Sequence, residues 1–393
     1  MVLGHQRSLQ RAVTVFSRQM QTPSYHVSDS AYSQARSKIE PEVFLDLHRL
    51  VVGMYEQSSQ ENPTPLRLWC GRRLVGCDTS IINLPDTPEL RRRFSVVKNS
   101  HGSHVQGQVS VCFDVLNDIG LSVALGRLSS EPAYVLEHHL KELPEASVNL
   151  FDRGYGDYTM LASMLKSGRD FILRCSRQSF AAVRTFIASE QTDTELLVDA
   201  PSHRRVALKK QGLPLQLRLR AVKIILPNGE IEILLTSLLD TEIYPKSALA
   251  EAYRLRWGIE TFFDRIKNIY DLERFSGQSL HSIEQDLYGI FFLATLEAVL
   301  TEPVQEAFDQ RYAKDPTMYC KQVNRALSYG TLLDTVIVLL LDTSVSLETT
   351  LENLYRLFAD KPNLVRPNRR FPRDEVSHAK QLRFRKYKKK NLL

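Results

Sequence analysis

The sequence predicts an α/β protein built on a mixed sheet flanked by helices, and three observations lead to this prediction. Short apolar or alternating runs, typical of strands, occupy residues 66–125, 148–152 and 170–174. Helical patterns at 131–143 and 157–166 separate the last of these runs. Hairpin-linked strands followed by strand–helix–strand units are expected to form one sheet with antiparallel and parallel pairs.

Composition limits the class of protein. The chain has 393 residues, 43% of them hydrophobic, which is enough for a packed core in two or three domains. Its net charge of +6 suits an anionic partner, although many proteins without one carry a similar excess. The five cysteines include no Cys-x-x-Cys pair, which favours reduced thiols in the cytoplasm.

No membrane partner is expected. The N-terminus has charges throughout and no apolar region of a secretory signal. The longest apolar run near the C-terminus, Val336–Leu341, is far too short to span a bilayer. We therefore expect a soluble intracellular protein.

The first part of the chain is predicted to be helical and then to change to strands. Residues 1–62 form a helical region and a candidate DNA-binding region, with Ser28 as a helix cap. Residues 63–175 form the first part of the sheet, starting with a hairpin around 70–72. Adjacent His138 and His139 lie on a predicted helix with Glu137 and could suggest a metal site. Neighbouring helix positions face different ways, which argues against a shared metal ion, so we expect both histidines at the surface.

The second part returns to helices after a further group of strands. Residues 176–243 are predicted as a β-rich insertion, in which Pro227-Asn-Gly229 joins two alternating runs as a hairpin. Residues 244–300 complete the core, and 301–393 form a helical C-terminal region with a basic tail. The tail at 383–390 mixes cations with aromatics, which suits phosphate contacts and a solvated tail equally.

One helical segment carries a candidate functional stripe. At about 100° per residue, Tyr253, Arg256, Glu260 and Lys267 fall within roughly 60° of each other on a helix. Its apolar residues fall on another side, so one face packs while the other presents two cations, a carboxylate and a phenol. Taken alone, an exposed ion pair four residues apart explains such a stripe better than function does.

The same segment resembles a known family. Tyr253-x-x-Arg256-x-x-x-Glu260, followed by Lys267, is similar to the YREK motif of the insertion-sequence-four family of bacterial DDE transposases. The resemblance extends over most of the chain, including the N-terminal segment 28–36 and the segment 274–279 after the motif.

Such an enzyme needs two further carboxylates at strand ends. Asp78 follows the apolar run 73–77, and Asp152 ends the strand 148–151 and begins Asp-Arg-Gly-Tyr. The insertion accounts for the long separation between Asp152 and Glu260. As isolated residues, Asp78 is explained as a turn cap and Asp152 as an Asx-turn before Gly154. The matched helix and the strand order favour the catalytic interpretation of both.

The resemblance implies a fold and a reaction. It implies an RNase H-like fold in which Asp78, Asp152 and Glu260 are catalytic and bind two Mg²⁺ or Mn²⁺ ions. It also implies that Tyr253, Arg256 and Lys267 bind the DNA phosphates near the cleaved end. The expected partners are double-stranded DNA, at the element ends and the target, and a second copy in a homodimer. We expect a cytoplasmic, nucleoid-associated location.

Two alternatives stay open from the sequence. One is a domesticated or inactive DNA-binding derivative, against which the complete set of motif residues argues. The other is an RNase H-like nuclease with a different substrate. Metal-dependent nicking of end DNA distinguishes an active transposase from the first alternative, and terminal inverted repeats beside the gene distinguish it from the second.

Overall fold

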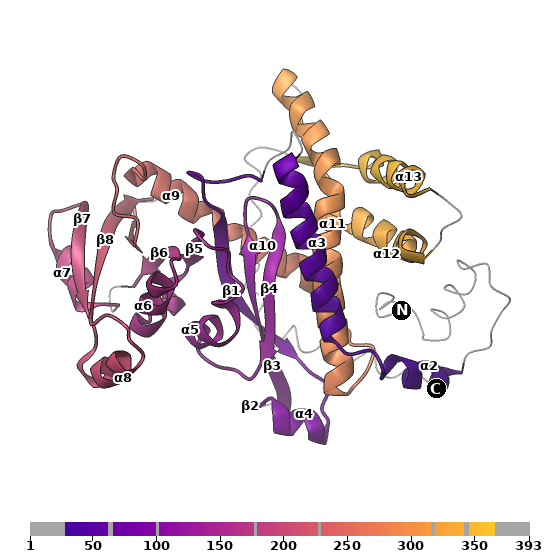
Figure 1. Ribbon diagram of the computed structural model, residues 1–393, viewed down its shortest axis with the longest axis horizontal. Coiled ribbons are helices and arrows are strands. Elements are labelled where there is room, and N and C mark those ends of the chain that lie inside the picture. Colours follow the sequence, from indigo (N-terminus) through magenta and orange to yellow (C-terminus); the bar gives the residue numbers. More distant parts are fainter. Residues whose placement is uncertain are drawn as a thin grey trace.

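A computed structural model describes residues 28–61, 66–99, 102–176, 179–226, 229–315, 319–341 and 346–365. Residues 1–27 and the predicted basic tail at 383–390 lie outside this part of the chain. Within it, a large mixed sheet has helices on both faces (Figure 1). This confirms the predicted α/β class.

The large sheet has nine strands in the described residues, in the order β2-β3-β1-β5-β6-β9-β8-β7, with β4 also paired to β3. Its strands are β1 (Leu74–Asn83), β2 (Ser95–Asn99), β3 (Gly102–Asp114), β4 (Ile119–Gly126), β5 (Val148–Phe151), β6 (Asp170–Cys175), β7 (Asp193–Asp199), β8 (Gln216–Ile225) and β9 (Ile231–Thr236). A separate pair is formed by β10 (Cys320–Gln322) and β11 (Asn363–Val365).

The core of this sheet has the RNase H-like strand order. β3 runs antiparallel to both β1 and β4, whereas β5 and β6 continue the sheet in parallel on the other side of β1. Alternation along β3 explains its burial on two faces, because Val111 and Phe113 pack in one core cluster and Cys112 packs in another. Three antiparallel strands followed by two parallel ones agree with the fold that the resemblance implies.

The β-rich insertion extends the same sheet. β9 pairs antiparallel with β6, β8 with β9 and β7 with β8. The predicted hairpin between β8 and β9 is confirmed, with Gly229 at φ 82° in its turn, while Pro227 and Asn228 lie outside the described residues.

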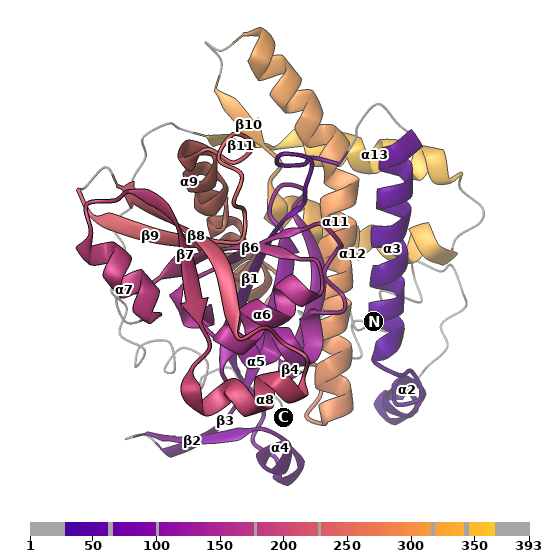
Figure 2. The same ribbon diagram turned by 60° about the vertical axis from the view of Figure 1, so that its left-hand side comes forward.

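Helices cover both faces of the sheet. Before the insertion's last strand the chain forms α2 (Asp29–Arg36), α3 (Glu42–Glu61), α4 (Pro88–Arg93), α5 (Glu131–Tyr134), α6 (Tyr158–Lys166), α7 (Ala181–Ala188) and α8 (Arg205–Lys210). After it come α9 (Lys246–Leu255), α10 (Trp257–Asp264), α11 (Leu280–Lys314), α12 (Arg325–Leu341) and α13 (Leu347–Asp360). Short helical turns are η1 (Val135–His139), η2 (Arg153–Tyr155), η3 (Ser202–Arg204) and η4 (Arg265–Ile269). Figure 2 shows α5, α6 and α8 together in front of the sheet and α3 beside α11.

The N-terminal helices dock on α11. Ser28 caps α2 as predicted, because its Oγ accepts a hydrogen bond from the Ala31 N–H at 3.1 Å. Arg36 at the end of α2 donates to Asp286 of α11 at 2.8 Å and to Gln285 at 2.6 Å. These bonds join two segments that are far apart in the sequence.

Helix α11 is long and apolar enough to cross a membrane by length and composition, but 67% of its most apolar window is buried inside the protein. Such burial is typical of a core helix, and α11 packs against α3 and β4. The described residues contain one helix that passes this test.

Some local predictions were wrong. Around residues 70–72 the chain makes a tight turn closed by a single bridge between Trp69 and Arg72, not a two-stranded hairpin. The predicted helix at 131–143 is a short α-helical turn followed by the π-helical η1. His139 is fully buried, because Ser122 and Ser110 bond to its two ring nitrogens at 2.8 and 2.9 Å.

Candidate active site

Asp78 lies inside β1, not at its end as predicted. The strand continues to Asn83 because its antiparallel pairing with β3 persists, with Asp78 opposite Val111. The parallel pairing of β1 with β5, however, stops at Gly76 opposite Leu150. Asp78 is therefore placed just past the edge where its parallel neighbour ends.

Asp152 follows the last residue of β5, as predicted. Its Oδ1 accepts a hydrogen bond from the Gly154 N–H at 2.7 Å, so it forms the Asx-type turn that the sequence also allowed. This bond turns the chain directly after the strand, and the side chain is left partly exposed at the carboxyl end of β5.

Glu260 is brought to this edge by close packing of α10 on β1. A Cβ on Gly76 of β1 would lie 3.4 Å from the Cβ of Ile259 and 3.2 Å from Val115. The absence of a side chain at Gly76 thus lets α10 approach the strand closely. Ile259 is fully buried at this contact, and the next residue, Glu260, is carried to the side of Asp78.

Arg256 links two of these carboxylates. Its Nη2 lies 2.6 Å from Glu260 Oε1, and its Nη1 lies 4.0 Å from Asp78 Oδ2. The predicted ion pair four residues apart therefore exists, but Arg256 is 9% exposed and so is not on a solvated face. Its guanidinium joins the helix residue to the strand residue.

The helical segment departs from the ideal projection. α9 ends at Leu255, α10 begins at Trp257, and the helix widens to the π-helical η4 from Arg265. These changes alter the angle per residue, so the four motif residues do not share one exposed stripe.

Tyr253 and Lys267 accordingly lie apart. Tyr253 is 7% exposed, packs in an apolar cluster with Leu74 and Leu150, and its buried hydroxyl has no hydrogen-bond partner among the described residues. Burial raises the pKa of its phenol well above the usual range. Lys267 donates from Nζ to the Ile81 carbonyl of β1 at 2.9 Å.

A fourth carboxylate, which sequence reasoning missed, lies at the same edge. Glu131 begins α5, and its Oε1 accepts a hydrogen bond from Thr79 Oγ1 at 3.2 Å. Its Oε2 lies 2.0 Å from where a Cβ on Gly154 would stand. No local pattern identifies this residue, since the partners Thr79 and Gly154 belong to other elements.

Two of the four carboxylates, Asp78 and Glu131, have raised pKa values. Burial raises the pKa of Asp78 to about 6; the nearby charges of Asp152 and Glu260 add to this rise, while the Thr79 N–H and Arg256 oppose it. Burial, followed by the charges of Asp152 and Asp78, raises the pKa of Glu131 to about 7. The site therefore holds more negative charge than Arg256 balances.

These donors fit a divalent cation in kind. Magnesium and manganese prefer carboxylate oxygens, and four carboxylates gather at this edge of the sheet. As the side chains are placed in the described residues, no group of three or more Asp, Glu, His or Cys could hold a metal ion, and Glu260 is paired with Arg256. The space at Gly154, which a Cβ would fill, leaves room for carboxylate oxygens from two sides.

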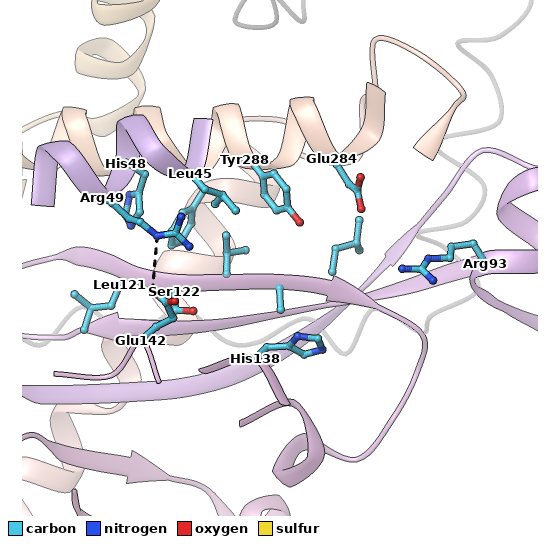
Figure 3. Close-up of a pocket in the computed structure, with 14 residues that line it drawn as sticks. Leu45, His48, Arg49, Arg93, Leu121, Ser122, His138, Glu142, Glu284 and Tyr288 are labelled. Carbon is cyan, nitrogen blue, oxygen red and sulfur yellow. Dashed lines mark ion pairs between the residues drawn. The ribbon is translucent and has the colours of Figure 1, made fainter. Parts of the chain in front are cut away.

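A cavity of about 260 Å³ lies elsewhere, between α3, β4 and α11 (Figure 3). Arg49 and Glu142 form an ion pair at 3.8 Å across it. Burial lowers the pKa of His48, which lines it, to about 4, so the imidazole is neutral. None of the motif residues lines this cavity, so it is separate from the candidate site.

Sequence comparisons show which known proteins this chain resembles. Residues 72–296 match the family model described as "Transposase DDE domain". The chain is 23% identical over 279 residues to "Transposase InsG for insertion sequence element IS4" of Escherichia coli (strain K12), covering 69% of this chain and 60% of that protein. The chain thus spans less than two thirds of that relative's length.

Comparison of the fold with solved structures gave a further match. The "Cryo-EM structure of piggyBac transposase synaptic complex with hairpin DNA (SNHP)" matches 80% of this chain and 62% of that one, with a TM-score of 0.39 and 9% identity. The strand order described above, not this match, carries the assignment of the fold.

Proposed function

This chain belongs to the transposase DDE-domain family, and we propose that it catalyses metal-dependent cut-and-paste transposition of an insertion sequence. The predicted resemblance to the insertion-sequence-four family is confirmed. The observation that carries the proposal is that Asp152 and Glu260, from a neighbouring strand end and a helix, lie near Asp78, and that Arg256 joins Asp78 to Glu260.

The proposed reaction has two steps on phosphodiesters. Water first hydrolyses a strand at the element end, and the freed 3′-hydroxyl then attacks target DNA, displacing a 3′-oxygen. Two bound Mg²⁺ or Mn²⁺ ions would activate the attacking oxygen and stabilise the leaving one. Asp78, Asp152 and Glu260 would hold these ions with hard oxygen donors.

The surrounding residues bind and orient DNA in this proposal. Arg256, which pairs with Glu260 here, is positioned to neutralise a phosphate when the carboxylates bind metal. Lys267, eleven residues after Arg256, supplies a second cation. The resemblance assigns Tyr253 to DNA binding, but its hydroxyl is buried here, so contact with a phosphate oxygen would require the ring to move. The proposed partners are element-end and target DNA and a second copy of the chain.

The test is cleavage of DNA that carries the element's ends. We expect Glu260→Gln to abolish Mg²⁺-dependent nicking while the purified protein still binds the end DNA. Glu251→Gln is the matched control, because Glu251 is an exposed carboxylate on α9. If Glu260→Gln cut at the parent rate, the assignment of the site would fail. Binding without nicking by the parent protein would favour the DNA-binding derivative instead.

A further inference from the structure

We propose that Glu131 is a fourth carboxylate of the metal site, and that residue 154 is glycine because the Glu131 carboxylate occupies the space of a side chain there. The inference rests on the proposed function, since it assigns one more residue to the same site.

One hydrogen bond and one close approach place the Glu131 side chain at the site. Thr79, the residue after Asp78, donates to Oε1 at 3.2 Å. The other oxygen, Oε2, points to Gly154, two residues after Asp152. The carboxylate is thus held between the segments that carry both aspartates.

The space at Gly154 shows how near the carboxylates lie. A Cβ there would be 2.0 Å from Glu131 Oε2 and 3.0 Å from Asp152 Oδ1. The two oxygens are therefore at most about 5 Å apart, the sum of these distances. One divalent ion, at about 2.0–2.6 Å from each oxygen, spans such a gap.

Backbone conformation does not explain this glycine. Gly154 is not among the described glycines with positive φ, so an L-residue could adopt its backbone. A Cβ there would meet the two carboxylates, so the Glu131 side chain would have to move to make room for one. The glycine of Asp-Arg-Gly-Tyr thus has a spatial reason that involves Glu131.

The charge balance of the four carboxylates also supports a role of Glu131 in binding a cation. Among the described residues, the ion pairs of Asp78, Glu131, Asp152 and Glu260 involve a single guanidinium, that of Arg256. A purely structural acceptor for Thr79 needs no charge at position 131, because an amide oxygen accepts equally. A carboxylate added to an already negative site is instead suited to a bound cation.

The first experiment measures Mn²⁺ binding to the full chain by calorimetry without DNA. Glu131→Gln keeps the shape and the acceptor for Thr79 but removes the charge, and we expect it to weaken Mn²⁺ affinity by about tenfold or more. Glu137→Gln is the matched control, because Glu137 lies on the next turn with its side chain 69% exposed. Parent affinity in Glu131→Gln would overturn the proposal.

The same titration separates this proposal from the proposed function. Asp78→Asn and Asp152→Asn are expected to weaken Mn²⁺ binding as well. If these two weaken it and Glu131→Gln does not, the role of Glu131 is wrong and the proposed function stands. If all three bind as the parent does, the metal site itself is wrong, and the proposed function fails with it.

A double-mutant cycle tests the role of Gly154. We expect Gly154→Ala to lower Mn²⁺ affinity about tenfold and to lower the unfolding temperature, because its methyl group displaces the Glu131 carboxylate. In a Glu131→Ala background, the space is free, and Gly154→Ala should then change both quantities little. Equal losses in both backgrounds would show that Glu131 is not the reason for the glycine.

Discussion

Two groups of charged residues each include a residue of the helical stretch 256–265, and the groups differ in their charge balance. The carboxylate cluster consists of Asp78, Glu131, Asp152 and Glu260 with Arg256 as their cation. The Asp118 network consists of Asp118, Arg265, Glu297 and Arg325, two carboxylates with two guanidiniums.

The pKa values follow this difference. Packing around Asp118 alone would raise its pKa, but Arg265 and Arg325, at 2.7 and 2.6 Å, outweigh that effect and lower it. In the carboxylate cluster, by contrast, the pKa of Asp78 and of Glu131 is raised. A balanced group stabilises the fold by itself, whereas an unbalanced one is suited to bind a cation.

The largest expected effect is on activity in the carboxylate cluster. Asp78→Asn and Asp152→Asn should each lower Mg²⁺-dependent cleavage of end DNA by about a thousandfold or more, the scale on which charged groups act in phosphoryl transfer. Neither change should lower the unfolding temperature, since each removes one negative charge from a group of carboxylates that repel each other. A variant that cleaved within tenfold of the parent would remove that aspartate from the catalytic group.

The next effect is on stability, in the Asp118 network. Asp118→Ala leaves the buried Arg265 without its carboxylate. It should lower the free energy of unfolding by about 3 kcal/mol. This is the low end of the range for a broken buried ion pair, because the Asp118 side chain is 37% exposed. Denaturant unfolding measures this change. Asp264→Ala, at an exposed neighbour of Arg265, is the control, with a change within about 0.5 kcal/mol. Unaltered stability in Asp118→Ala would break the comparison.

A metal-dependent gain in stability should be smaller. Mg²⁺ at a hundred times its dissociation constant should stabilise the parent by about 2.7 kcal/mol, because the ion binds the folded state. Thermal unfolding with and without Mg²⁺ should show this gain in Asp118→Ala but not in Asp78→Asn. A gain retained in Asp78→Asn would place the ion elsewhere.

The smallest effect concerns pH in the metal-free protein. A carboxyl pKa raised by folding means that the folded state keeps protons that the unfolded state releases. The free energy of unfolding therefore falls as the pH rises from about 4, where the carboxyls of the unfolded chain titrate. The fall continues through the folded-state pKa values, about 6 for Asp78 and about 7 for Glu131.

Removing the charge of Glu131 should recover part of the stability that is lost at high pH. The measurement is the unfolding temperature of Glu131→Gln minus that of the parent, in a chelator. This difference should be a few degrees higher at pH 8 than at pH 4, since about 1 kcal/mol corresponds to roughly 2–4 °C in domains of 150–250 residues. A difference from the parent that is the same at both pH values would mean that the Glu131 charge is not under repulsion.

Local patterns were sufficient for much of the fold. Alternation along 108–114 and the Pro-Asn-Gly turn near 229 depend on neighbouring residues, and both elements are present. The position of Asp152 directly after β5 follows from the same local rules. The fold class was predictable because hydrophobic periodicity reports which faces must be buried.

Other features could not be predicted from local patterns. The projection placed Tyr253 on an exposed stripe, but the chain changes helix at Arg256 and buries the ring against β1 and β5. His139 was expected at the surface, but hydroxyls from β3 and β4 satisfy its ring inside the protein. In each case the deciding partner belongs to a distant segment.

The sequence by itself determined the α/β class, the order of strands and helices along the first part of the chain, and the helical segment with Glu260, because these depend on periodicity and on side-chain types close together in the chain. The tertiary structure alone decided that Asp78 stands inside its strand, that Arg256 joins it to Glu260, and that Glu131 reaches the space at Gly154. Such contacts depend on how closely α5 and α10 pack on the sheet, and packing distance is a property of three dimensions.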